Sequence, residues 1–203
     1  MHLRSADCQV CVTGLDIVTP PIPNIRPWPV TRSRELAHLR IFDLRADIRV
    51  SPRTGQEHEV YVLKCPDWVN VVAITPDQQL ICVEQFRHGS NTAELEIPGG
   101  VIDPQDLSPL EAGLRELREE TGYAGEKARI ISRIFPNPAI MDNTCHTVLV
   151  ENCRVQHQLH LDDGEDLVTR LVPVREIRDL LLSGKIKHSL VIVALSKYLL
   201  MQQ

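Results

Sequence analysis

Three glutamates share one face of a predicted helix. Glu116, Glu119 and Glu120 are spaced at i, i+3 and i+4, which brings their carboxylates together on the helix surface. Shortly upstream, residues 96–100 read Glu-Ile-Pro-Gly-Gly, and the paired glycines allow the backbone to approach another group closely. Carboxylates together with an exposed backbone carbonyl are the hard oxygen ligands that Mg²⁺ or Mn²⁺ prefers, and bound phosphates would complete the shell. The pattern therefore favours a metal site.

The alternative is an acidic helix face that is merely solvated. Like charges on one helix face repel each other, and Arg115 and Arg118 would relieve part of that repulsion. For an arbitrary helix this simpler interpretation would be preferred. The glycine pair upstream of the helix is what favours metal binding here.

The segment 100–123 resembles the signature of the Nudix hydrolases, Gly-x5-Glu-x7-Arg-Glu-U-x-Glu-Glu-x-Gly-U, where U is apolar. Chance agreement at the matching positions has odds on the order of 10⁻⁸ per starting position. Three departures are present: Asp106 replaces the first Glu, eight residues rather than seven separate it from Arg115, and Tyr123 takes the last apolar place. The matching positions are Gly100, Arg115, Glu116, Glu119, Glu120 and Gly122.

The resemblance implies roles for these residues, position by position. Glu116, Glu119 and Glu120 look like the metal-binding glutamates of the family, and Gly99 looks like its backbone-carbonyl ligand. Arg115 looks like the residue that orients the glutamates. The implied cofactor is Mg²⁺ or Mn²⁺, and the implied substrate is a small molecule linked to a nucleoside diphosphate.

Three weaker similarities indicate ADP-ribose as that substrate. The strand end at 83–87 resembles the Gln-Tyr-Arg of ADP-ribose pyrophosphatases, in which the arginine, here Arg87, contacts phosphate. Pro138, a candidate substrate-binding residue, lies fifteen residues after Tyr123, as in that subfamily. The acidic loop at 162–166 resembles the loop that supplies a catalytic glutamate, here Glu165.

Each similarity also has a purely structural interpretation. Arg87 could be a surface residue, and the role of Pro138 could be limited to shaping a turn. The carboxylates around Glu165 would be called solvated in another context. Trp28 and Trp68 are candidates for stacking on a nucleobase, although a tryptophan near a strand more often packs in the core.

We therefore predict hydrolysis of the pyrophosphate bond of ADP-ribose, or of a related nucleoside diphosphate sugar, to AMP and a sugar phosphate. Glu165 is the predicted base, and Glu119 is the next candidate. One alternative is a Nudix hydrolase of another nucleoside diphosphate derivative, such as a dinucleoside polyphosphate or an oxidised nucleotide. The other is a non-catalytic nucleotide-binding module on the same fold.

The elements that must position these residues follow from hydrophobic patterns. Residues 1–38 are expected to form a proline-rich arm, and residues 39–203 the Nudix domain. Alternation predicts a hairpin from 44–50 and 60–63, and two Val- and Ile-rich runs, 68–75 and 80–86, predict a central sheet that is covered on both faces.

The helix that carries the glutamates has strong boundary signals. Ser108 is a predicted cap, Pro109 suits the first helical position, and Gly122 is a typical stop. Further strands are expected at 128–135, 147–153 and 167–172, and helices at 175–182 and 189–201. This order predicts an α/β fold, an α/β/α sandwich with a mixed sheet.

Composition narrows the classes of partner. The net charge is −5 with no long run of like charge, which argues against nucleic acid or a membrane as a partner. A cytoplasmic location is expected, and the six cysteines of the chain are predicted to be free. Four of them are predicted to be small buried groups: Cys65, Cys82, Cys145 and Cys153. The alternating strand after the proline-rich arm leaves a homodimer open.

Overall fold

The computed structural model describes residues 24–161 and 166–203 of the chain. Within these residues the strands form a three-stranded sheet, a seven-stranded sheet and a two-stranded ribbon. The elements are β1 (Val30–His38), β2 (Asp43–Val50), β3 (Glu57–Lys64), β4 (Trp68–Ile74), β5 (Gln79–Arg87), β6 (Thr92–Glu96), β7 (Gly99–Val101), α1 (Pro109–Thr121), β8 (Tyr123–Ala124), β9 (Lys127–Ile134), β10 (Cys145–Glu151), β11 (Arg154–Val155), β12 (Leu167–Pro173), the 3₁₀ turn η1 (Val174–Glu176), α2 (Ile177–Leu182) and α3 (Ser189–Met201).

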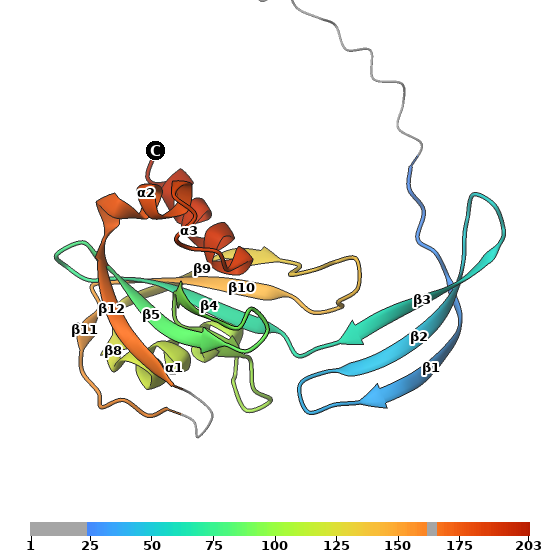
Figure 1. The fold of residues 1–203 in the computed structure, drawn as a ribbon, viewed down its shortest axis with the longest axis horizontal. Coiled ribbons are helices and arrows are strands. Elements are labelled where there is room, and N and C mark those ends of the chain that lie inside the picture. The colour runs from blue at the N-terminus through green and yellow to red at the C-terminus, as the bar shows by residue number, and fades with distance from the viewer. Residues whose placement is uncertain (1–23, 162–165) are drawn as a thin grey trace, which may run out of the picture.

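The seven-stranded sheet lies at the centre of the molecule, between α1 on one face and α2 with α3 on the other (Figure 1). Its strand order is β12-β5-β4-β10-β9, with β6 paired to β5 and β7 paired to β4. Strands β4 and β10 are parallel and the other pairs are antiparallel. The predicted mixed sheet of an α/β/α sandwich is therefore confirmed.

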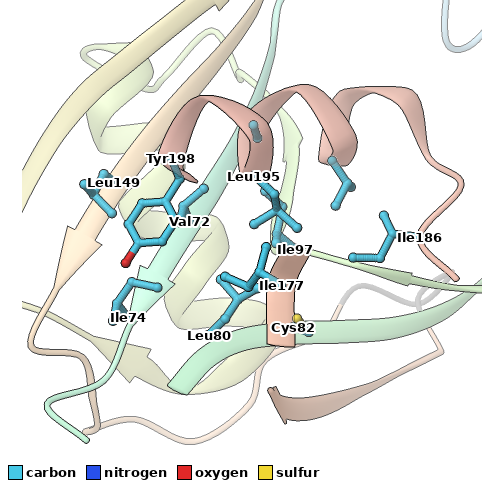
Figure 2. Close-up of a cluster of buried hydrophobic side chains, with 12 residues drawn as sticks. Val72, Ile74, Leu80, Cys82, Ile97, Leu149, Ile177, Ile186, Leu195 and Tyr198 are labelled. Atoms are coloured by element: carbon cyan, nitrogen blue, oxygen red, sulfur yellow. The ribbon is translucent and has the colours of Figure 1, made fainter. Parts of the chain in front are cut away.

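Strand β4 is buried on both faces because each face of the sheet carries its own core. Val69, Val71 and Ala73 pack toward α1, whereas Val72 and Ile74 pack toward α2 and α3. Figure 2 shows the second of these cores, in which Leu195 and Tyr198 of α3 cover the sheet. The Val- and Ile-rich composition of the run is explained by this double burial.

Helix α1 begins and ends where its sequence predicts. The side chain of Ser108 accepts a hydrogen bond from the backbone N–H of Glu111, and Pro109 stands at the start of the helix. Gly122 has a φ of 72°, a left-handed conformation that favours glycine, and its N–H donates to the carbonyl of Arg118. These caps define the ends of the helix, and Ala112 and Leu117, which are buried in the core against β4, orient its faces.

A separate sheet of β1, β2 and β3 extends to one side of the central sheet (Figure 1). The predicted hairpin of β2 and β3 is present. Strand β1 was not predicted, because its residues fell in the stretch taken as an irregular arm. Most of its side chains are exposed, so it shows no alternating burial, and its pairing with β2 alone defines it.

The cysteines are free among the described residues, as predicted. Cys82, Cys145 and Cys153 are buried, and burial raises the pKa of the Cys82 thiol to about 12. Cys65 is only partly buried, so the prediction of a buried group was wrong there. Cys8 and Cys11 lie outside the described residues. Across residues 24–161 and 166–203, the helices are too short or too polar to cross a membrane.

Candidate active site

The carboxylates of α1 are organised by Arg115. Its Nη1 donates to Glu116 Oε1 at 3.0 Å and to Glu119 Oε2 at 3.1 Å. Arg118 contacts the other oxygen of Glu119 at 3.5 Å. Glu116 and Glu120 are buried, and Glu119 is partly exposed. The predicted acidic face is therefore a largely buried cluster rather than a freely solvated surface.

Asp106 holds Arg115 in place. Its two oxygens accept from Arg115 Nε at 3.1 Å and Nη2 at 3.0 Å, a two-pronged contact. These hydrogen bonds lower the pKa of Asp106 and raise that of Arg115. Arg115 also donates to the carbonyl of Val101 at 3.1 Å, which ties the helix to β7. The shorter side chain at position 106 reaches the arginine from the loop before the helix.

The glycine pair lies directly against these carboxylates. Gly99 and Gly100 pair with Asn70 and Val69 in β4, and the N–H of Gly99 donates to Glu120 Oε2 at 3.0 Å. A Cβ on Gly99 would collide with the backbone of β4, and a Cβ on Gly100 would collide with the carboxylate of Glu116. Only glycine allows this approach, so the pair brings backbone and carboxylates into contact.

The donor set has the chemistry that a hard divalent cation requires, namely buried carboxylates and a neighbouring backbone segment. In the part of the chain that the structure describes, no three His, Cys, Asp or Glu side chains converge as a ready-made metal site. Glu116 and Glu119 instead face Arg115. The residues fit a cation whose remaining ligands come from substrate and water, as is usual for Mg²⁺.

A cavity of about 610 Å³ opens beside the glycine pair. Gly99 and Gly100 form part of its wall, so the same two residues contact both the cavity and the carboxylates of α1. A cavity of this size suits a small-molecule ligand. Its other lining residues include Phe42, Trp68, Asn70, Arg87, Glu96, Met141, His188 and Val191.

Arg87 reaches this cavity in contact with a buried acid. Its Nε donates to Glu96 Oε1 at 2.7 Å and its Nη2 donates to Glu96 Oε2 at 2.9 Å. Glu96 is 2% exposed and also lines the cavity. No role was predicted for Glu96. The available signal was an acidic residue between the apolar Leu95 and Ile97, three positions before Gly99.

The other sequence-predicted residues are dispersed. Trp68 begins β4, is partly buried and lines the cavity, whereas Trp28 packs against His58 of the small sheet with ring centroids 5.4 Å apart. Pro138 is exposed and is not among the residues that line the cavity; Met141, from the same loop, takes that place. Glu165 lies outside the described residues.

Comparison with known proteins identifies the domain and its relatives. The sequence model of the NUDIX domain matches residues 66–192. The ADP-ribose pyrophosphatase of Bacillus subtilis is 31% identical over 135 residues, 62% of this chain and 72% of that protein. The ADP-sugar pyrophosphatase of mouse is 37% identical over 91 residues, which cover 43% of this chain and 41% of that protein.

The fold has a close counterpart among solved structures. The crystal structure of an ADP compounds hydrolase superimposes with a TM-score of 0.78 at 21% identity, over 89% of this chain and 96% of that one. At 21% identity the structural similarity supports the fold alone, and the family assignment rests on the matched NUDIX domain. The chain belongs to the Nudix family, as a hydrolase related to the ADP-ribose pyrophosphatases.

Proposed function

We propose that the protein hydrolyses the pyrophosphate bond of ADP-ribose, or of a related nucleoside diphosphate sugar, with the help of a divalent metal ion. The products are AMP and a sugar phosphate. The observation that carries this proposal is the position of Gly99 and Gly100, which line the cavity and also contact the carboxylates of α1. A ligand that fills the cavity and reaches past these glycines presents its pyrophosphate to the carboxylates.

In this proposal Glu116, Glu119 and Glu120, with the carbonyl of Gly99, hold Mg²⁺ or Mn²⁺. When bound, the ion activates a water molecule and neutralises charge on the phosphate oxygens. Arg115 orients Glu116 and Glu119, in keeping with its bonds of 3.0 Å and 3.1 Å to them. The contact with Asp106 keeps the guanidinium in the plane that these bonds need.

Glu165 is the proposed general base, by its resemblance to the loop glutamate of ADP-ribose pyrophosphatases. Glu119 is the second candidate because it is the most exposed of the three helix glutamates. A base must come within hydrogen-bond reach of the attacking water.

Arg87 and Trp68 are proposed to bind the substrate inside the cavity, and Pro138 to shape the loop that carries Met141. The two relatives described above are named for ADP-ribose and ADP-sugar hydrolysis, which supports a substrate of this class.

A homodimer is also proposed: β1 is exposed and carries Val30 and Leu36, which suits a subunit contact. Sedimentation velocity would test the dimer. A cytoplasmic location stays a prediction.

The direct test is phosphate release from ADP-ribose, coupled to a phosphatase, with and without Mg²⁺. We expect activity that requires the metal, and AMP as the nucleotide product by chromatography. Metal-dependent turnover of a dinucleoside polyphosphate or an oxidised nucleotide, but not of ADP-ribose, would favour the alternative substrates. Binding of ADP-ribose with no turnover of any of these compounds would favour a non-catalytic module.

Arg87→Lys tests the substrate contact. Lysine keeps the positive charge but loses the planar two-pronged geometry, so we expect KM for ADP-ribose to rise about tenfold with kcat nearly unchanged. Steady-state kinetics at saturating Mg²⁺ measures both constants, and an unchanged KM would exclude the contact. Arg170→Lys, which alters an exposed ion pair with Glu84, is the control and should leave KM unchanged.

A further inference from the structure

His188 is the residue immediately before α3, the position at which a capping side chain is usual. Ser, Thr, Asp or Asn at this position would accept a hydrogen bond from the first turn of the helix, and histidine is not among the favoured caps. The His188 side chain makes no capping bond. A helix start that forgoes this stabilisation is expected where the residue serves another purpose.

The backbone around His188 is firmly anchored. Ile186 before it is 1% exposed and Val191 after it is 2% exposed. The side-chain amide of Asn70 donates to the carbonyl of Leu190 at 3.3 Å, which ties the first turn of α3 to β4. The backbone position from which the imidazole projects is therefore set by the fold.

The imidazole approaches the carboxylate that holds Arg87. Nε2 of His188 lies 3.8 Å from Glu96 Oε2, the oxygen that also accepts from Arg87 Nη2 at 2.9 Å. Within the described part of the chain, Nδ1 is buried and has no hydrogen-bond partner. The Glu96 carboxylate thus lies close to the ring, and His188, Glu96 and Arg87 all line the same cavity.

The orientation of this carboxylate decides the orientation of Arg87. A two-pronged contact requires both oxygens to lie in the plane of the guanidinium. A rotation of Glu96 would therefore break at least one of its two bonds to Arg87. A group placed beside Oε2 restricts that rotation, at a distance that permits electrostatic attraction but is too long for a full hydrogen bond.

We propose that His188 is a positioning residue, which holds the Glu96 carboxylate in the orientation that presents Arg87 to the substrate. The effect on substrate binding rests on the proposed function, whereas the effect on Arg87 does not. At position 188 the chain therefore lacks the stabilisation of a helix cap, and histidine instead controls the orientation of Arg87 in the cavity. Replacements at this position should separate helix stability from substrate binding.

Two substitutions make that separation. His188→Gln places its amide nitrogen near the position of Nε2, so it can donate to Glu96, and it is a poor cap. His188→Asn is a good cap but is too short to reach Glu96. We expect H188N to raise the Tm by a few degrees and KM for ADP-ribose about fivefold, with kcat unchanged. We expect H188Q to keep KM within about twofold of the wild type.

The side-chain NMR signal of Arg87 Nε–H tests the same proposal without activity. The signal is assigned by its loss in Arg87→Lys, and it reports the 2.7 Å bond to Glu96. Its chemical shift should stay at the wild-type value in H188Q and move toward the value of solvent-exposed arginines in H188N.

An unchanged signal and KM in H188N would overturn the proposal, and so would a signal in H188Q that moves as in H188N. If the wild type does not hydrolyse ADP-ribose, the proposed function fails, and the NMR comparison still decides the role of His188.

Discussion

Two regions of the molecule each contain a network of carboxylates and arginines, yet their balance of charge differs. In the small sheet, Asp47 is 2% exposed and contacts Arg45 and Arg49 at 3.2 Å and 3.1 Å. Arg45 also contacts Asp142 at 3.5 Å. This network pairs two arginines with two carboxylates, and Ser33 donates a further hydrogen bond to Asp47. Its charges are balanced.

The network around α1 has a surplus of negative charge. Arg115 contacts four carboxylates, those of Asp103, Asp106, Glu116 and Glu119, and the second arginine, Arg118, contacts Glu119. Glu120 adds a further buried carboxylate beside Gly99. The five carboxylates of this network outnumber its two arginines, and a bound cation would offset part of that difference in charge. The comparison indicates that the small-sheet network stabilises the fold, whereas the α1 network is suited to hold a metal ion.

The substitution with the largest expected effect, and therefore the strongest test of this comparison, is Glu120→Gln. The amide keeps the size and hydrogen bonding of the side chain but removes one ligand charge. We expect kcat for ADP-ribose to fall by about 10²-fold or more, with the Tm nearly unchanged. Steady-state kinetics at saturating Mg²⁺ measures the loss. Glu111→Gln, on the exposed first turn of the same helix, is the control and should keep kcat.

Arg115→Lys tests whether the surplus carboxylates need orientation. Lysine keeps the charge but cannot make the two-pronged contact with Asp106 while it also bonds Glu116 and Glu119. We expect kcat to fall about tenfold or more, as for other residues that support metal ligands. Arg118→Lys, at a half-exposed site, should change kcat less than about twofold. Equal effects of the two variants would contradict the role of Arg115.

Asp47→Asn tests the balanced network. The change removes the ion pairs with Arg45 and Arg49 from a buried site, so the free energy of unfolding should fall by about 1–3 kcal/mol. Urea unfolding followed by circular dichroism measures this loss, and kcat should stay at the wild-type value. Glu57→Gln breaks an exposed pair with Arg32 in the same sheet and should cost less than about 1 kcal/mol.

The smallest effect is a dependence of stability on pH that both networks share. Hydrogen bonds from Arg115 lower the pKa of Asp106 below its usual 3.8, and a hydrogen bond from Ser33 does the same for Asp47. A lowered pKa stabilises the fold above pH 3.8, and the contribution is lost as the pH falls through the folded-state value. Asp106→Asn should therefore lose less stability than the wild type between about pH 5 and about pH 2. An identical slope would contradict the shift.

Local sequence patterns predicted the elements whose signals are local. The caps at Ser108 and Gly122 defined α1, and the apolar run of β4 defined a strand covered on both faces. The spacing of Glu116, Glu119 and Glu120 placed them on one face. These features depend on neighbours along the chain, so the sequence was sufficient.

Features that depend on distant contacts were missed. Strand β1 exists through its pairing with β2, and the short β6 and β7 exist through pairing with β5 and β4. The cavity joins residues as far apart as Arg87 and His188, which no pattern within either segment reveals. The place of Asp106 beside Arg115 likewise follows from the loop conformation, although the departure from the family signature marked the position.

Binding of Mn²⁺, followed by electron paramagnetic resonance, tests the difference between the two networks most directly. The wild type and Asp47→Asn should bind Mn²⁺ with equal affinity, because the balanced network takes no part in holding the ion. Glu120→Gln should bind it about tenfold more weakly or worse. Equal Mn²⁺ binding by Glu120→Gln and the wild type would contradict the assignment of the surplus carboxylates on α1 to a metal site.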